Sequence, residues 1–179
     1  MTFLSTSRLF LRTPIEKDAG LLADFEERNR DHFSPWQSTS FEDEPNYLAK
    51  IKGWEKEEKE GRSLRFLTFK KEDLLEKVIG VCNFTQIFRQ SFQACYLGYR
   101  IDRKEEGKGL MSEALREAIQ YMFAQEKLHR IMANYMPSNR RSANLLKRLG
   151  FVEEGYAKSY LFINGRWEDH VLTALINLE

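Results

Sequence analysis

The alternation of apolar and polar positions divides the chain into strand-like and helix-like segments. Residues 8–14 alternate apolar and polar side chains and end at a proline, which predicts a strand. Further runs rich in β-branched and aromatic residues, separated by polar connections, also predict strands. These runs span residues 63–70, 78–87, 93–101, 129–136, 151–163 and 167–176. Asn164-Gly165 between the last two runs predicts a hairpin turn.

Four segments have apolar residues at helical spacing instead. The most regular begins at Gly109, and its apolar positions recur through Phe123. A short helix is predicted over 139–149, followed by a glycine typical of helix ends. Two earlier helices are predicted over about 15–29 and after Pro45. Because hairpins alternate with strand–helix–strand connections, we expect an α/β protein with a mixed sheet rather than a doubly wound parallel one.

Length and composition narrow the class of protein. With 179 residues and 42% hydrophobic residues, the chain predicts one folded domain over residues 1–179. The 28 basic and 27 acidic residues nearly cancel, which excludes the strongly basic character of a general nucleic-acid binder. No apolar run is long enough to span a membrane, and no signal-peptide pattern is visible. Two cysteines and three scattered histidines suggest neither a disulfide framework nor a metal site, so we expect a cytoplasmic protein.

Residues 104–109 (KEEGKG) are the segment most suggestive of chemistry. They follow a predicted strand and open the most regular helix, where backbone N–H groups and the helix dipole favour an anion such as pyrophosphate. Gly107 and Gly109 let the backbone approach phosphate oxygens without a Cβ atom. A dinucleotide-binding GxGxxG motif is excluded because Ser112 occupies its third glycine, and a Walker A motif is absent.

The remaining pattern, [Q/R/K]-x-x-G-x-G before a helix, resembles the acetyl-CoA loop of the GNAT acetyltransferase superfamily. Downstream, Asn139-Arg-Arg-Ser142 and Leu149-Gly-Phe151 resemble the N-x-x-S…GF block of its RimJ/RimL branch. The runs ACYLGY, GKGLM and FSPW fit the same branch, and the resemblance extends from about Ser7 to Leu175.

The resemblance implies a GNAT fold, with a mostly antiparallel seven-stranded sheet flanked by helices and splayed between the strands 93–101 and 129–136. Acetyl-CoA would lie in that gap as co-substrate, without a metal. The implied cofactor-binding residues are Tyr99, Ile101, Gly107, Lys108, Gly109, Leu110, Met111, Asn139 and Ser142. The implied acceptor-binding residues are Phe33, Trp36, Phe84 and Tyr96.

Two positions depart from the family pattern. Lys104 stands where the loop usually has Gln or Arg, so it keeps a donor but loses planar bidentate geometry. Leu146 stands where many members carry a tyrosine acid, which assigns the acid role to Ser142. Because no covalent enzyme intermediate is needed, Cys82 and Cys95 are expected to be core residues.

The implied reaction is acetyl transfer to the α-amine of the N-terminal alanine of a small-subunit ribosomal protein. An α-amine with a pKa of about 7.8 is roughly 10–15% neutral at pH 7, so water-relayed deprotonation is sufficient. The candidate carboxylates Glu106, Glu154 and Asp169 are more simply solvated charges. Asp169 and His170 are expected to point to opposite faces of a strand and not to share a site.

Two alternatives remain open from the sequence. One is an acetyltransferase for a small amine, such as an antibiotic or polyamine, which predicts an acidic acceptor pocket. The other is a ribosome-assembly factor with incidental catalysis, binding through the basic face of residues 140–148. That face carries Arg140, Arg141, Lys147 and Arg148, which could instead hold the 3′-phosphate of CoA. Neither membrane association nor direct sequence-specific binding of nucleic acid is expected.

Overall fold

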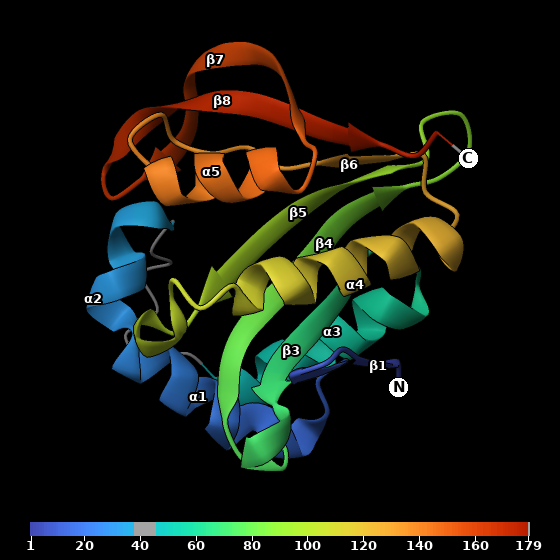
Figure 1. The fold of residues 1–179 in the computed structure, drawn as a ribbon, viewed down its shortest axis with the longest axis vertical. Helices are drawn as coiled ribbons and strands as arrows, with labels where there is room; N and C mark the ends of the chain where they lie inside the picture. Colours follow the sequence, from blue (N-terminus) through green and yellow to red (C-terminus); the bar gives the residue numbers. More distant parts are fainter. Residues whose placement is uncertain (38–45, 179) are drawn as a thin grey trace.

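A single mixed sheet organises the molecule. The computed structural model describes residues 1–37 and 46–178, and its eight strands follow the order β1-β2-β3-β4-β5-β6-β8-β7 (Figure 1). The strands are β1 (Phe3–Ser5), β2 (Leu9–Arg12), β3 (Leu64–Lys70), β4 (Val78–Phe88), β5 (Ala94–Ile101), β6 (Arg130–Met132), β7 (Val152–Ile163) and β8 (Arg166–Ile176). Only β5 and β6 run parallel, so the prediction of a mixed, mostly antiparallel sheet is confirmed.

The predicted number of seven strands is wrong by one. The additional strand, β1, is three residues long, which is too short for an alternating pattern to stand out in the sequence. It is held by antiparallel pairing with β2, in which Leu4 lies opposite Leu11.

Helices cover both faces of the sheet. They are α1 (Ala19–Arg28), α2 (Arg30–Phe33), α3 (Tyr47–Lys59), α4 (Leu110–Ala124) and α5 (Arg140–Arg148). Successive side chains of a strand point to opposite faces, so Phe66 of β3 joins the core beneath α4 and α5, whereas Leu67 joins the core beneath α1 and α3. In Figure 1, α4 crosses the face of the sheet that is turned to the viewer and α3 lies behind it. None of the described helices is both long and apolar enough to cross a membrane.

The sheet opens between β5 and β6, as predicted. The two strands pair only where residues 94–96 lie opposite residues 130–132. Beyond Tyr96, β5 diverges from β6 toward α2 (Figure 1). The segment predicted as a strand over 129–136 is correspondingly short, and after β6 only an isolated bridge joins Tyr135 to Val171 of β8. The second half of β5 therefore has one edge without a neighbouring strand.

The helix predicted over about 15–29 is broken near its start, whereas its end agrees with α1, which ends at Arg28. Residues Glu16–Asp18 form a 3-10 turn, and a separate short helix, α2, follows α1. The buried Asp18 carboxylate explains the break, because it accepts two hydrogen bonds of 2.6 Å from Arg12 and one of 2.8 Å from the Ile15 N–H. Pro45, predicted to precede α3, lies outside the described residues.

The predicted short helix over 139–149 and the predicted hairpin turn are confirmed. The side-chain oxygen of Asn139 caps α5 by accepting a hydrogen bond of 3.1 Å from the Ser142 N–H. Gly150 follows that helix with a φ of 89°. Asn164-Gly165 turns the β7–β8 hairpin with φ values of 49° and 81°, as a turn with two left-handed residues requires.

Candidate active site

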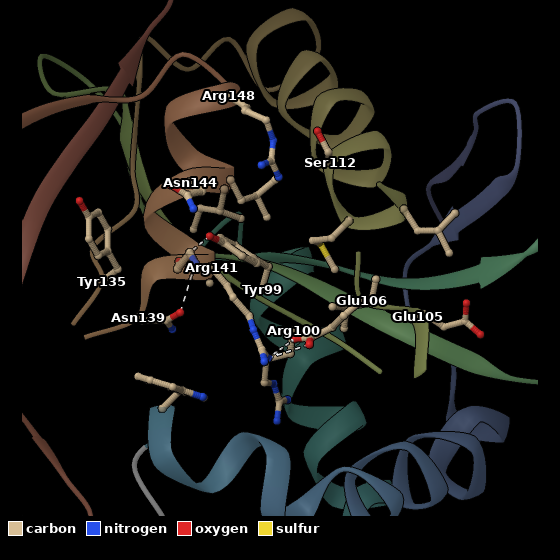
Figure 2. A pocket seen from close by; sticks show the side chains of 18 of the residues that line it. Tyr99, Arg100, Glu105, Glu106, Ser112, Tyr135, Asn139, Arg141, Asn144 and Arg148 are labelled. Carbon is tan, nitrogen blue, oxygen red and sulfur yellow. Dashed lines mark hydrogen bonds and ion pairs between the residues drawn. The ribbon is translucent and has the colours of Figure 1, made fainter. Parts of the chain in front are cut away.

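A cavity of about 1130 Å³ occupies the opening between β5 and β6. It is lined by the open half of β5, the start of α4, the first turns of α5, the region around α2, and β8 (Figure 2). Its volume exceeds that of a typical small-molecule pocket, which suits a long ligand or two ligands together.

The open edge of β5 presents backbone hydrogen-bonding groups to this cavity. The Asp102 N–H, just after β5, donates to the Ile79 carbonyl of β4 at 2.8 Å. Because backbone groups alternate in direction along a strand, those of Tyr99 and Ile101 face away from β4, toward the opening. Both residues line the cavity, as the resemblance implied.

The start of α4 presents a second set of free backbone groups. Gly107 and Gly109 both lie in the left-handed region, with φ values of 73° and 75°. Gly109 is the N-cap residue and no side chain caps the helix, so the first N–H groups stay open to a ligand. Gly107, Gly109, Leu110 and Met111 all line the cavity.

Two lysines of this loop point elsewhere. Lys108 does not line the cavity, and its Nζ atom lies 2.9 Å from a carboxylate oxygen of Glu105. Only its backbone N–H can take the predicted part in ligand binding. Lys104 does not line the cavity either, and its N–H donates to Asp102 at 3.0 Å. The ligand-facing surface of the loop is therefore made by backbone and glycine rather than by lysine side chains.

The loop is held in place by residues that the sequence did not single out. Glu113 of α4 accepts hydrogen bonds from the Thr6 hydroxyl at 2.5 Å and the Arg8 Nε at 2.7 Å. Arg8 also donates to the Lys108 carbonyl at 3.0 Å. Burial alone would raise the pKa of Glu113, but the hydrogen bonds from Thr6, Arg8 and Ser7 outweigh it and lower the pKa to about 2. A charged Glu113 thus ties the N-terminal segment to the start of α4.

Ser142 and Tyr99 meet across the cavity. Their hydroxyl oxygens lie 2.6 Å apart, and Figure 2 shows Tyr99 pointing at the first turn of α5. Burial raises the pKa of Tyr99 to about 12, although the hydrogen bond with Ser142 lowers it, so the phenol is protonated at neutral pH. Asn139 lines the cavity beside them, with its oxygen used by the helix cap. Leu146 is buried in the core and offers no proton.

The residues expected to bind the acceptor divide into two groups. Phe33 and Trp36 line the cavity near α2. Phe84 is fully buried in the core beneath α4 and presents no surface to an acceptor, so its predicted role is not supported. Tyr96 does not line the cavity, and burial and the neighbouring Tyr160 hydroxyl raise its pKa. Both misplaced aromatic residues lie on strands, where the sequence did not reveal which face meets the opening.

All three carboxylates considered as bases already have partners. Glu106 lines the cavity, but Arg141 binds its two oxygens at 2.9 and 2.7 Å. Glu154 pairs with Arg130. Asp169 accepts hydrogen bonds from the Tyr156 hydroxyl at 2.7 Å and the Ser159 N–H at 2.8 Å.

The two adjacent residues Asp169 and His170 do point to opposite faces of β8. Asp169 is bound on an exposed face, whereas His170 is buried and lines the cavity. The two residues do not form a pair, as predicted, but the position of His170 in the cavity wall was not predicted from the sequence. The cysteines are core residues as predicted, because Cys82 and Cys95 are both buried and burial raises their pKa values to about 12.

Comparison with known proteins agrees with this geometry. Residues 8–152 match the family described as acetyltransferase (GNAT) domain. The chain belongs to the GNAT acetyltransferase family. It is 47% identical over 175 residues to the "[Ribosomal protein uS5]-alanine N-acetyltransferase" of Escherichia coli K12, covering 96% of this chain and 89% of the relative.

Solved GNAT structures superpose over nearly the whole chain. The ribosomal-protein-S5-alanine acetyltransferase from Vibrio fischeri has a TM-score of 0.92 and 34% identity, covering 100% of this chain and 98% of the other. Mycobacterium smegmatis RimJ in complex with CoA-disulfide has a TM-score of 0.86 and 25% identity, covering 94% and 81%. The GNAT fold predicted from the sequence is confirmed.

The GNAT cavity of this chain fits acetyl-CoA, the co-substrate of the family. The uncapped N–H groups at Gly109 and the adjoining glycine loop suit a pyrophosphate, and the open β5 edge suits the amides of a pantetheine arm. Of the basic residues on α5, Arg141 and Arg148 line the cavity, whereas Arg140 and Lys147 are exposed outside it. Among the described residues there is no group of three or more His, Cys, Asp or Glu side chains placed to hold a metal.

Proposed function

We propose that the protein transfers the acetyl group of acetyl-CoA to the N-terminal α-amine of a ribosomal protein, and that the acceptor is the N-terminal alanine of the small-subunit protein uS5. The observation that carries the choice of acceptor is the 47% identity, over 96% of the chain, to an enzyme named for that reaction. Such an acceptor places the reaction in the cytoplasm.

The backbone of the chain would do most of the binding. Acetyl-CoA supplies an acetyl thioester, an acyl group activated for attack by an amine. The N–H groups from Gly107 to Met111 would bind the pyrophosphate, and the open backbone groups of Tyr99 and Ile101 would pair with the pantetheine arm. The amide nitrogen of Asn139 makes no hydrogen bond within the described residues and is available to the same arm.

The reacting groups would lie where β5 meets α5. A backbone N–H from the stretch Tyr99 to Ile101 would stabilise the negative charge that develops on the acetyl oxygen. The Ser142 hydroxyl would give its proton to the leaving sulfur. The protonated Tyr99 hydroxyl, 2.6 Å from Ser142, keeps a second proton beside that position.

The cavity favours an α-amine over a polyamine. A lysine amine with a pKa of about 10.4 is only about 0.04% neutral at pH 7, several hundredfold less than an α-amine. A cationic polyamine would need free carboxylates, but Glu105, Glu106 and Glu113, which line the cavity, are each paired with a lysine or arginine. The assembly-factor alternative rests on Arg140 and Lys147, which lie outside the cavity and leave acetyl transfer unexplained.

The proposal is tested by acetyl transfer to defined acceptors. Wild-type protein and acetyl-CoA are incubated with a peptide that begins with a free alanine, with an N-blocked peptide that contains an internal lysine, and with spermidine. Turnover of the free N-terminus alone supports the proposal, and preferential turnover of spermidine or lysine contradicts it. Purified uS5 and intact small subunits form a second arm, which shows whether a folded acceptor is required.

A further inference from the structure

His170 is a buried histidine in the wall of the cavity that no step above uses. Its exposed fraction is only 4%, yet it lines the same cavity as Tyr99 and Ser142. It lies on β8 immediately before Val171, which is bridged to Tyr135, a residue that also lines the cavity. A buried polar ring at the wall of a binding site needs a partner or a function.

The hydrogen bonds of the ring determine which nitrogen carries the proton. Nδ1 lies 3.1 Å from the backbone carbonyl oxygen of Glu168. A carbonyl only accepts, so Nδ1 must be the donor and Nε2 of the neutral ring keeps its lone pair. Nε2 makes no hydrogen bond within the described residues. The ring is therefore held in the tautomer that a proton acceptor requires.

An aromatic side chain packs near the His170 ring. The Tyr160 ring of β7 lies 5.5 Å away between centroids, and the Tyr160 hydroxyl accepts a hydrogen bond from Asn134 at 3.3 Å. The nearest carboxylate in the chain, that of Asp169, is turned to Tyr156 and Ser159 on the other face of β8. No described carboxylate is hydrogen-bonded to His170, although the charge of Asp169 is near enough to interact with the ring.

We infer that His170 is the general base of the reaction. The inference rests on the proposed acetylation of an amine. As the amine nitrogen forms its bond to the acetyl carbon, Nε2 of His170 accepts the proton that the nitrogen loses. The carbon–sulfur bond breaks and the sulfur takes a proton from Ser142. Ser142 then regains a proton from solvent, past the Tyr99 hydroxyl that lies 2.6 Å from it, and His170 releases its proton to solvent. The balance is one amide and one thiol formed, with one proton released when the amine enters as an ammonium.

The inference replaces the water relay expected from the sequence with a specific acceptor. Glu106, Glu154 and Asp169 are engaged by other groups, whereas Nε2 has its lone pair free. Imidazole is also the side chain whose ordinary pKa lies nearest to neutral pH, as a general base requires.

Two substitutions separate catalysis from structural support. His170→Asn places an amide N–H where Nδ1 stands and can keep the bond to Glu168, but it has no group at Nε2. His170→Gln reaches the Nε2 position with a non-basic amide and loses the Nδ1 donor. His129→Gln, at an exposed histidine outside the cavity, is the matched control. Each variant is checked by thermal melting and acetyl-CoA binding before its kcat is measured.

A general base predicts that both His170 variants lose kcat by about 10²-fold or more while their affinity for acetyl-CoA stays near the wild-type value. A purely structural ring predicts activity in His170→Asn and loss only in His170→Gln, which overturns the inference, as does full activity in both. The activity of the wild-type protein tests the proposed function separately, because it shows whether the α-amine is acetylated at all. If the protein acetylates a different amine, the ratio of the kcat of each variant to that of the wild type, measured with that amine, still tests the role of His170.

A modification experiment covers the case in which the His170 variants do not fold. In a His32→Gln/His129→Gln double variant, His170 is the sole histidine of the chain. Diethyl pyrocarbonate, which acylates neutral imidazole nitrogen, is added and activity is compared with the same variant untreated. Loss of activity in step with one modified histidine, prevented by bound acetyl-CoA and peptide, supports the inference. Retained activity after that modification overturns it.

Discussion

The cavity has two walls that are built in different ways. One, the backbone wall, consists of the open edge of β5 and residues 107–111, and it offers N–H and C=O groups from nearly one continuous stretch of chain. The other, the side-chain wall, consists of Phe33, Trp36, Tyr135 and His170, which come from three distant parts of the sequence. Recognition by backbone depends on local conformation, whereas recognition by side chains depends on how the whole sheet is assembled.

The largest effect is expected at Ser142, which stands between the two walls. Ser142→Ala removes the hydroxyl that lies 2.6 Å from Tyr99 and is assigned to protonate the leaving sulfur. We expect kcat to fall by about 10²-fold or more, with little change in KM for acetyl-CoA. Steady-state kinetics on the alanine peptide measure both values. Ser138→Ala, at an exposed turn outside the cavity, is the control, and a kcat within about threefold of wild type in Ser142→Ala contradicts the assignment.

The backbone wall is tested by adding one methyl group. Gly109→Ala places a side chain at a φ of 75°, which costs about 1–2 kcal/mol for an L-residue and turns the N–H groups at the start of α4 away from the ligand. We expect KM for acetyl-CoA to rise about tenfold while KM for the peptide changes little. Gly53→Ala in α3 is the same substitution where a Cβ meets nothing within 4 Å, and it should leave both values unchanged. Equal effects of the two substitutions would contradict the role of Gly109.

The side-chain wall is tested by Trp36→Ala, for which a smaller change is expected. Trp36 is 40% exposed, so an acceptor can cover only part of its ring, worth about 1 kcal/mol. KM for the peptide should rise about fivefold while KM for acetyl-CoA stays constant, the reverse of Gly109→Ala. Trp167→Ala, at a tryptophan of β8 that is 62% exposed and does not line the cavity, is the control. A rise in KM for acetyl-CoA without a rise in KM for the peptide would contradict the assignment of Trp36 to acceptor binding.

The same contrast explains what the sequence could predict. Gly107 and Gly109 were found because a strand, a glycine turn and a helix start follow one another in the chain, whereas Asn139 came from the family resemblance. The splayed sheet came from the family resemblance, which carries long-range information that periodicity lacks. The missed strand β1 and the broken first helix depend on pairing with distant or buried partners.

The side-chain contacts were predicted less well for a physical reason. Phe84 has the same aromatic, strand-like surroundings as a residue of the cavity, but its side chain points to the face beneath α4. His170 was considered only as a partner of Asp169, because the fold alone shows that β8, beyond the short strand β6, lines the cavity. Arg8 and Glu113 are 105 positions apart, so no local pattern joins them.

The smallest effect on turnover is expected at Glu113, which supports the backbone wall from behind. Glu113→Gln removes the charge that accepts hydrogen bonds from Thr6 and Arg8. We expect the free energy of unfolding at pH 7 to fall by about 2 kcal/mol, the usual contribution of charged hydrogen bonds. At saturating acetyl-CoA, kcat should remain near wild type, because Glu113 contacts neither reacting group. Urea denaturation and steady-state kinetics measure the two quantities.

The pH dependence of the unfolding free energy distinguishes the contribution of the Glu113 charge from that of its side-chain packing. The native pKa of about 2 lies below the ordinary value of 4.5, so the native state holds the ionised carboxylate more strongly than the unfolded chain does. This contribution is complete above pH 4.5 and disappears as the pH falls through about 2. The difference in unfolding free energy between wild type and Glu113→Gln should therefore shrink across that window. Glu117→Gln, one turn further along α4 and without an ion pair among the described residues, should show no such change, and a constant difference down to pH 2 in Glu113→Gln would mean that packing rather than charge holds the loop.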